Sequence, residues 1–267
     1  MVKMYLDVIA CSYKENIDFS QLLGLPTYSS HKIGDVWHGK TSLNYSQWCY
    51  NSKSFENKNI DFVLRSFMNM IKDKQDVFIK KLNETESELS IYVVVEKEKN
   101  DLLNCAIDKD LISFYGSLNA SIAIDGLVDE VFDTDLTFDD IQNIQELETI
   151  KPIMSLDFNI SSNEQIKFND KSFDELKVIN GNEGNNYWCK ISTPEIQCDD
   201  TDELVKYFYK QLEFNGILDE INLILGTKNM GISVDNRDNA CYSISFECET
   251  VNFLRKLNTD VFIDFKV

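Results

Sequence analysis

The chain carries one closing pattern twice: Leu118-Asn119-Ala120-Ser121-Ile122-Ala123-Ile124-Asp125, and 139 residues later Leu257-Asn258-Thr259-Asp260-Val261-Phe262-Ile263-Asp264. A shared dipeptide precedes both endings, Trp48-Cys49 in the first case and Trp188-Cys189, 140 residues further on, in the second. About 75 residues therefore align between the two stretches with one net gap. Because an internal repeat sets the number of structural units before any local motif does, the sequence predicts two copies of one domain.

The repeat divides the chain into a first repeat domain at 1–128, an acidic segment at 129–150 and a second repeat domain at 151–267. A total of 267 residues suits two ordinary domains, and each copy is long enough to bury a core of its own. Only three prolines occur, which argues against long disordered linkers. Apolar residues between the acidic ones favour a short helix over 138–150 that packs across the two copies.

Apolar periodicity predicts the elements of the first copy. Alternation over residues 89–95 is typical of a strand, and we expect residues 105–107 to be its neighbour in the sheet. Residues 36–37 and 47–50 are expected to pair as strands, and a short amphipathic helix at 111–118 leads into the final strand. A longer helix follows from the single apolar stripe of Ile60, Val63, Leu64, Phe67, Met68 and Ile71.

The second copy repeats this order without the loop that residues 24–35 form in the first. Asp200 and Glu203 resemble a capping box at a helix start. Alternating helices and strands indicate an α+β fold, with two tandem copies of a mixed sheet and helices packed on one face. Three apolar triplets predict the elements: a helix with Leu204, Phe208 and Leu212, a strand with Ile221, Leu223 and Leu225 that matches 89–95, and a helix with Val251, Leu254 and Leu257.

Charge is divided unevenly between the copies. The whole chain carries a net charge of −19; residues 1–128 hold 14 Lys and Arg against 17 Asp and Glu, and residues 129–267 hold 12 against 28. A shared fold does not require this difference, because net charge governs solubility and partners. The composition disfavours nucleic acid, whose phosphates would be repelled, and favours a basic protein partner, with simple solubility as the alternative explanation.

Two acidic clusters are the candidate contacts for such a partner. The first lies in segment 129–150, which holds eight acidic residues and no lysine or arginine. The second lies at a predicted helix start, where the helix dipole by itself also favours carboxylates. The predicted partner-binding residues are Asp129, Glu130, Asp133, Asp135, Asp139, Asp140, Asp199, Asp200, Asp202 and Glu203.

The sequence contains no catalytic signature: the glycine-rich phosphate motifs and the GxSxG nucleophile motif do not occur. His31 and His38 are the only histidines, and neither has a second His or a Cys at metal-binding spacing. The acidic run from Asp133 resembles a calcium loop but has Phe138 and Ile144 where that loop requires Gly and Glu. We therefore expect no enzyme activity, no cofactor and no metal.

Cysteine use and hydropathy bear on the cellular compartment. The seven cysteines form no CxxC pair, which is typical of reduced, buried thiols. The first residues lack the apolar core of a signal peptide, and no apolar run reaches membrane-spanning length. These features predict a cytoplasmic protein that does not contact membranes.

Some residues are expected to serve the scaffold. The repeated tryptophans are expected to anchor the core, each donating its indole N–H to a backbone carbonyl. Because Ile124 and Ile263 should face the core, Asp125 and Asp264 should face away from it. The predicted structural residues are Trp48, Trp188, Gly34 and Pro26.

Several short motifs of the first copy occur together. Residues 22–27 read Leu-Leu-Gly-Leu-Pro-Thr, residues 32–35 read Lys-Ile-Gly-Asp, and Trp48 and the ending at 118–125 follow. With these motifs, residues 3–128 resemble the bacterial domain-of-unknown-function family 4279. The second copy has Trp188 and the ending but lacks the first two motifs. That family is similar to small bacterial proteins encoded near toxins, so the resemblance implies an immunity role and assigns no catalytic residues.

Three functions remain open on the sequence. The leading hypothesis is a cytoplasmic immunity protein that binds and neutralises a bacterial toxin domain through its acidic surface. The second is a protein-interaction module without a toxin partner. The third is a small-molecule binder that uses the cleft between the repeats, supported by the loop from His31 to Asp35.

Overall fold

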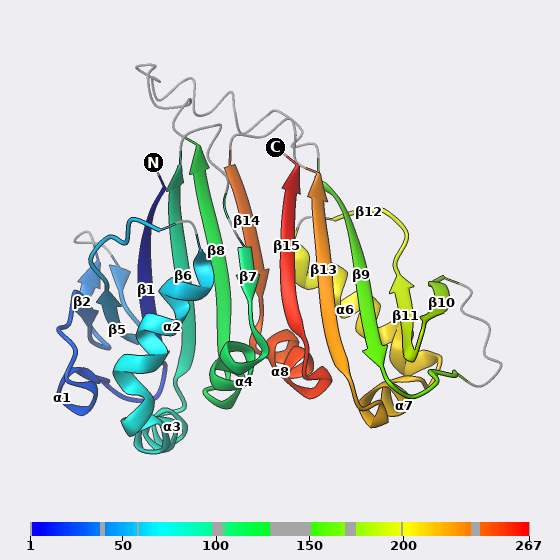
Figure 1. Cartoon of the computed structure of the whole chain (residues 1–267). Coiled ribbons are helices and arrows are strands. Elements are labelled where there is room, and N and C mark those ends of the chain that lie inside the picture. The colour runs from blue at the N-terminus through cyan, green and yellow to red at the C-terminus, as the bar shows by residue number, and fades with distance from the viewer. Residues whose placement is uncertain are drawn as a thin grey trace.

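The computed structural model describes residues 2–37, 41–57, 59–97, 103, 105–128, 151–168, 175–198, 200–235 and 241–266. The protein is a mixed α+β structure with two large mixed sheets, as the sequence predicts (Figure 1). We refer to residues 2–128 as the first half and to residues 151–266 as the second half. The helix predicted over 138–150 lies outside the described residues.

The first sheet has six strands in the order β14-β8-β6-β1-β5-β2. β6 and β8 run parallel, and the other neighbouring strands are antiparallel. Along β1 the side chains of Met4, Leu6 and Val8 are fully buried, while the residues between them lie on the partly exposed opposite face. The first-half strands of this sheet are β1 (Lys3–Ser12), β2 (Ser29–His31), β5 (Ser46–Asn51), β6 (Glu88–Lys97) and β8 (Ala120–Val128).

Helices of the first half cover the buried face of this sheet (Figure 1). The Asn59 side chain caps α2 by accepting a hydrogen bond from the Asp61 N–H at 3.0 Å. The predicted apolar stripe of α2 is buried, apart from Met68, which is partly buried. The helices are α1 (Ser20–Leu23), α2 (Ile60–Ile71), the 3-10 helix η1 (Lys72–Lys74), α3 (Gln75–Glu84) and α4 (Lys109–Ser117).

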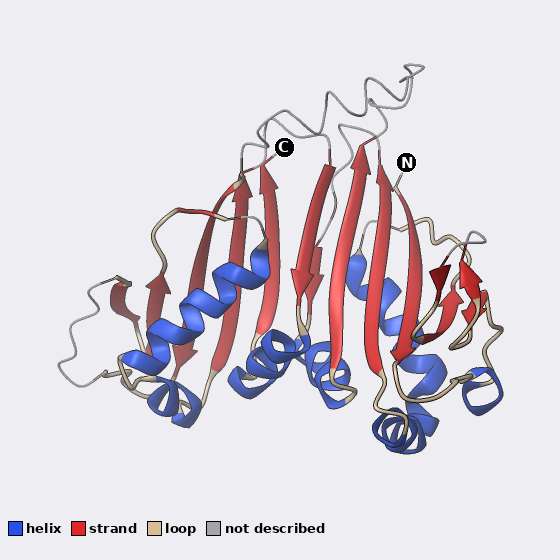
Figure 2. Cartoon of the chain, turned by 180° about the vertical axis from the view of Figure 1, so that it is seen from behind, coloured by secondary structure: helices blue, strands red, loops and turns tan. Residues whose placement is uncertain are grey.

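The second half follows the same order of principal strands and helices. Its sheet has the order β10-β11-β9-β13-β15-β7, with β12 paired to β9, and β13 and β15 are parallel. Seen from behind, α6 crosses this sheet on the side of the molecule opposite to α2 (Figure 2). The elements are β9 (Ile153–Ser162), β10 (Lys177–Glu183), β11 (Asn186–Ser192), β12 (Ile196–Gln197), α6 (Thr201–Phe214), α7 (Leu218–Leu223), β13 (Thr227–Asp235), α8 (Cys248–Leu257) and β15 (Asp260–Lys266).

One strand of each half joins the sheet of the other half. β7 (Cys105–Ile107) pairs antiparallel with β15, and β14 (Cys241–Phe246) pairs antiparallel with β8. The prediction that residues 105–107 lie beside residues 89–95 is therefore wrong. Both neighbours of β6 are already present, because β1 and β8 flank it.

The exchanged strands make the core continuous across the two halves. β7 also packs against α2, and β14 packs against α6. Full burial of an aliphatic or aromatic side chain is worth ~1.5–3 kcal/mol relative to exposure, so the halves depend on each other for a substantial part of their core. The seam consists of Cys105, Ile107, Ile122, Ile124, Ile244, Phe246, Val261 and Ile263, none more than 6% exposed.

Two further strand predictions are wrong. β3 (Val36–Trp37) pairs with β4 (Thr41–Ser42), whereas β5 lies between β1 and β2. In the second half, Ile221 and Leu223 belong to α7, and the strand that matches residues 89–95 is β13. Ile221 is buried while Leu223 is 80% exposed, so these alternating apolar residues do not form one buried strand face.

The two Trp-Cys dipeptides occupy different registers. Trp48 lies opposite Ala10 on the buried side of β5, with no exposed surface, and its indole N–H donates to the Thr27 hydroxyl at 3.2 Å. In the second half Cys189 takes the corresponding inward position, opposite Ile160. A shift of one residue moves a side chain to the other face, so Trp188 is 38% exposed. The expectation of a core anchor is thus right for Trp48 and wrong for Trp188, and the acceptor for the Trp48 indole is a side-chain hydroxyl rather than the predicted backbone carbonyl.

Candidate functional site

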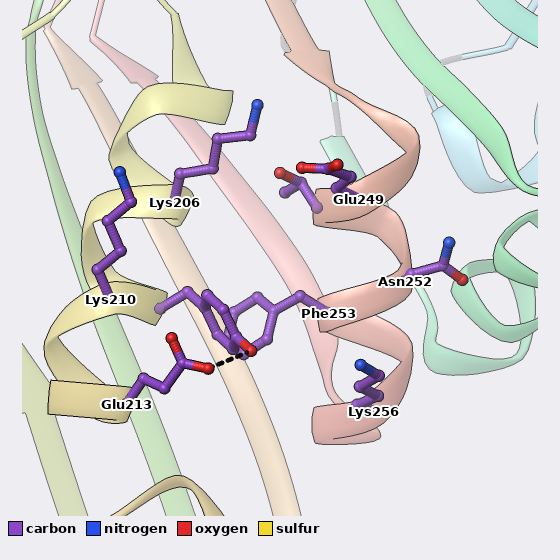
Figure 3. Close-up of a pocket in the computed structure, with 9 residues that line it drawn as sticks. Lys206, Lys210, Glu213, Glu249, Asn252, Phe253 and Lys256 are labelled. Carbon is purple, nitrogen blue, oxygen red and sulfur yellow. Dashed lines mark hydrogen bonds between the residues drawn. The ribbon is translucent and has the colours of Figure 1, made fainter. Parts of the chain in front are cut away.

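A groove of about 610 Å³ lies between α6 and α8. Figure 3 shows lysine and acidic side chains from both helices around this groove, with the Phe253 ring between them. Both helices are amphipathic and turn their apolar faces to the sheet, which leaves polar residues at their facing edges. The groove is lined by Lys206, Tyr209, Lys210, Glu213, Glu249, Thr250, Asn252, Phe253 and Lys256.

One end of the groove is fixed by an ion cluster. Asp200 caps α6 by accepting a hydrogen bond from the Glu203 N–H at 2.8 Å, as the predicted capping box requires of that residue. Asp202 then accepts from Lys206 Nζ at 2.8 Å and from the Glu247 N–H at 2.8 Å. Lys206 also pairs with Glu247, so one ammonium bridges the starts of two helices. Hydrogen bonds to Asp202 and Glu247 raise the pKa of Lys206.

The first half contains the same arrangement. Arg65 pairs with Asp61 at 3.2 Å and with Asp108, which caps α4. The Asp108 N–H donates to Asp61 at 3.4 Å, as the Glu247 N–H does to Asp202. Because this ion cluster joins the starts of equivalent helices in both halves, we interpret it as a structural clamp rather than as a binding site.

An aromatic pair forms the middle of the groove. The rings of Tyr209 and Phe253 have centroids 4.3 Å apart and are tilted by 57°, a favourable aromatic contact. The Tyr209 hydroxyl donates to the Glu213 carboxylate at 3.0 Å, drawn as the dashed line in Figure 3. This hydrogen bond raises the pKa of Tyr209 and holds its hydroxyl at the groove rim. The rings present a flat apolar surface between charged side chains.

Thr250 is the unusual residue of the groove lining. It is 2% exposed, and its Oγ1 has no hydrogen-bond partner within the described part of the chain. A buried hydroxyl without a partner destabilises a protein by ~1–3 kcal/mol. The equivalent position of α4 holds Leu111, which is fully buried. An apolar residue would therefore suit the core better here than threonine does.

Two further groove lysines also distinguish the second half. Lys210 on α6 and Lys256 on α8 are exposed and border the groove from opposite helices (Figure 3). The equivalent positions in the first half hold Asn69 and Ser117. The Ser117 hydroxyl there accepts a hydrogen bond from Gln75 at 2.6 Å, so α3 occupies the corresponding region. The cationic groove is thus a feature of the second half within the described residues.

The predicted acidic contacts divide into three groups. Asp200 is partly exposed and caps α6 through Oδ1, whereas Asp202 is 4% exposed within the ion cluster. Glu203 is exposed on the first turn of α6. Seven predicted contacts lie outside the described residues: Asp129, Glu130, Asp133, Asp135, Asp139, Asp140 and Asp199.

The loop from His31 to Asp35 is shaped by backbone contacts. The Asp35 carboxylate accepts a hydrogen bond from the Lys32 N–H at 2.7 Å, and Gly34 has a positive φ of 93°, which favours glycine. Pro26 is exposed in the segment after α1, and His38 lies outside the described residues. Asp35 therefore closes a turn, and Gly34 has the structural role that the sequence predicts.

Six cysteines are free thiols: Cys49, Cys105, Cys189 and Cys198, which are buried, and Cys11 and Cys248, which are partly buried. Burial raises the pKa of Cys105 and raises that of Cys189 to about 12, which keeps both protonated near neutral pH. The described residues contain no cluster of three or more side chains that could hold a metal ion. Among the helices that the structure describes, none is both long and apolar enough to cross a membrane.

A second hollow of about 510 Å³ lies on the helix-free face of the second sheet. Its lining includes Asp157 and Asp264, and Gly231 provides space at its floor. Asp264 is exposed while Ile263 is 6% exposed, which confirms that this aspartate faces away from the core. Lys190 binds the Asp157 carboxylate at 2.7 Å, so this site already holds its own counter-ion.

Sequence reasoning missed the groove between α6 and α8. Lys206 and Lys210 are four residues apart on one helix, so their shared face could have been read from the sequence. Lys256 comes from a helix that begins more than thirty residues after α6 ends. Only the packing of the two helices brings these lysines to one groove.

Comparison with known proteins gives a family match for the first half of the chain. No curated protein and no solved structure gave a significant match to the chain. A family model does match, and it covers residues 4–129, which include β1, β5, β6, β7 and β8 with α2 and α4. Residues 4–129 thus match the model of the family described as a domain of unknown function, DUF4279.

Proposed function

We propose that the protein is an immunity protein that binds and neutralises a basic bacterial toxin domain, and that residues 151–267 are a second copy of the DUF4279 domain. Support for the second copy comes from the shared strand order and from the ion clusters around Arg65 and Lys206. Both halves have the same layout of strands and helices but different surface residues, and we place partner binding on those surfaces.

The observation that carries the proposal is the charge difference between residues 1–128 and residues 129–267, which include the acidic segment. Residues 1–128 hold three more acidic than basic residues, whereas residues 129–267 hold sixteen more. The common fold does not need this excess, and uncompensated like charges oppose compaction. Acidic surfaces accelerate and orient docking of basic proteins. We place the contact surface at the acidic residues of segment 129–150 and at exposed Glu203 on α6.

Binding kinetics test the electrostatic part. The quadruple change Asp133→Asn, Asp135→Asn, Asp139→Asn and Asp140→Asn is compared with the native chain against the toxin domain encoded beside its gene. We expect association to slow about tenfold at low salt, and the native rate to fall as sodium chloride rises. The matched control neutralises exposed first-half residues: Glu15→Gln, Asp73→Asn, Asp76→Asn and Glu88→Gln. Equal association rates for all three proteins would reject the acidic surface.

A growth experiment tests the biological role. The gene is deleted alone and together with the neighbouring toxin gene. We expect the strain that lacks only this gene to be poisoned during contact with sibling cells. The strain that lacks both genes should grow normally. Normal growth of the single deletion while the toxin is active in other cells would point to an interaction module without a toxin partner.

A second candidate function is binding of a small aromatic anion in the groove between α6 and α8. The specific observation is the buried, unpartnered Thr250 Oγ1, beside an apolar ring pair and exposed lysines. Such a groove offers a hydroxyl and ammonium groups to an anionic head and a flat surface to a ring. This site is distinct from the cleft between the repeats that the sequence suggested.

Fluorescence titration with 8-anilinonaphthalene-1-sulfonate, an aromatic sulfonate, tests this candidate. The double change Lys210→Ala and Lys256→Ala should weaken binding about tenfold, and Thr250→Val should weaken it severalfold. Lys177→Ala, an exposed lysine on β10, is the matched control and should bind as the native protein does. Equal dissociation constants of the sulfonate for all variants would show that the groove is not its binding site.

A further inference from the structure

The contacts between the two halves are reciprocal. Cys105 of β7 lies opposite Ile263 of β15, and Ile107 lies opposite Val261. Ile244 of β14 lies opposite Ile124 of β8, and Phe246 lies opposite Ile122. Since each second-half residue stands 139 positions after its first-half equivalent, the two sets of pairs are the same pairs with the halves interchanged.

The helices beneath these strands meet in the same way. α4 packs against α8, the equivalent helix of the other half. A side chain at Gly116 would lie 3.0 Å from Cδ of Arg255, and these two residues are themselves equivalent positions. The Asn252 side chain donates to the Asn119 side chain at 2.9 Å across this contact. An equivalent residue meeting its counterpart is the property of a two-fold axis.

We infer that the DUF4279 domain carries a self-complementary docking surface, and that its partner is a second copy of the same domain. The surface consists of β7, the free edge of β8 and the outer side of α4, and in this chain the second half occupies it. A two-fold interface uses the same patch on both partners, so that residue i contacts j and j contacts i. The observed strand pairs satisfy this rule on both sides of the seam.

The interface is too well formed to be a loose contact between tethered domains. Without the second half, the edge of β8 would be an unpaired row of backbone donors and acceptors, and β7 would have no strand partner. The family match covers residues 4–129, whereas β14, the strand that pairs with this edge, lies outside the match. On this view the two halves would bind each other even if segment 129–150 did not connect them.

Cleavage of the full chain tests the association. A site for a specific protease is inserted in segment 129–150, and the folded protein is cut and passed over a sizing column with light scattering at micromolar and lower concentrations. We expect the two fragments to elute together at the 30.9 kDa mass of the intact chain plus the inserted site. Gly116→Leu is the comparison. Its added side chain would clash with Arg255 between α4 and α8, so the dissociation constant of the cut protein should rise at least tenfold. Separation of the native fragments into two folded monomers would overturn the inference.

A duplicated chain tests self-complementarity. Residues 1–128 are fused through segment 129–150 to a second copy of residues 1–128, in place of the second half. We expect a monomer that melts in one transition, with the amides of both β7 segments protected from hydrogen exchange. Two independently exchanging halves, or a chain that does not fold, would overturn the self-complementary surface. The inference rests on the proposal that residues 151–267 are a second copy of the domain. Neither experiment involves a toxin or a ligand, so failure of toxin or anion binding would leave both results unchanged.

Discussion

Asp61, Arg65 and Asp108 occupy in the first half the positions that Asp202, Lys206 and Glu247 occupy in the second. Elsewhere the halves differ. Thr250 stands where the first half has Leu111, and the second half has no buried tryptophan that corresponds to Trp48. The comparison separates two kinds of positions. Residues that hold helix starts have the same role in both halves, whereas the Trp-Cys dipeptide and the residues along the groove between α6 and α8 differ.

The ion clusters also show how one role tolerates different residues. Arg65 and Lys206 both bridge two carboxylates, although guanidinium and ammonium differ in geometry. The requirement is a cation that reaches two helix starts from the second turns of α2 and α6. The clamp therefore constrains position and charge more strongly than residue type.

The tryptophans give the largest expected difference between the halves. Trp48→Ala should lower the free energy of unfolding by ~3–5 kcal/mol, because it empties a fully buried site. Trp188→Ala should lower it by ~1 kcal/mol or less, because the indole is partly exposed over Gly181. Urea unfolding measures both values. Similar losses would mean that Trp188 anchors the core after all.

The ion clusters come next. Asp202→Asn should destabilise the protein by ~2 kcal/mol, and Asp61→Asn by ~1 kcal/mol. The side chain of Asp202 is 5% exposed and that of Asp61 is 20% exposed, while partly exposed Lys206 and Arg65 are screened by water. Thermal unfolding at neutral pH compares the two variants. A larger loss of stability for Asp61→Asn than for Asp202→Asn would contradict the view that burial of the carboxylate sets the size of the effect.

Alkaline pH probes the same cluster. The pKa of Lys206 is raised in the folded protein above the unfolded value of about 10.4. Its stabilising contribution is therefore complete below that unfolded value and disappears as pH rises through the folded pKa. Above about pH 10.4 the native protein should lose stability more steeply than Asp202→Asn. Parallel pH curves would show that the ion pair with Asp202 is not the cause.

Thr250→Val should stabilise the protein by ~1 kcal/mol, because it removes a buried hydroxyl that lacks a partner and retains the side-chain shape. The same change should weaken aromatic sulfonate binding in the groove. Urea unfolding gives the first value and fluorescence titration the second. Destabilisation by valine would indicate that the hydroxyl has a partner in solution.

The smallest expected effect concerns Lys228, which stands where the first half has Leu89. Lys228 is 7% exposed, and burial lowers its pKa. A lowered pKa penalises the folded state at neutral pH, and the penalty fades as pH rises towards the unfolded pKa. Lys228→Leu should add ~0.5–1 kcal/mol at pH 7 and less at pH 10. An equal gain at both values would assign the effect to packing alone.

Local patterns predicted much of the fold. The stripe from Ile60 to Ile71, the apolar triplet of α8 and the capping role of Asp200 are all confirmed. Ile221 and Leu223 misled the prediction, because short apolar alternation does not distinguish an exposed helix turn from a strand. The groove could not be predicted as a site, since its two helices are far apart in sequence.

By itself, the sequence determined the α+β class, the helix of α2 and the outward direction of Asp264, because side-chain periodicity reports which face is buried. Only the tertiary structure decided which sheet receives residues 105–107. An apolar strand can pair with any exposed edge of suitable register, and its own half offered no free place beside β6. The same limit applies to Trp188: one residue of register decides its face, and register is set by neighbouring strands rather than by the dipeptide.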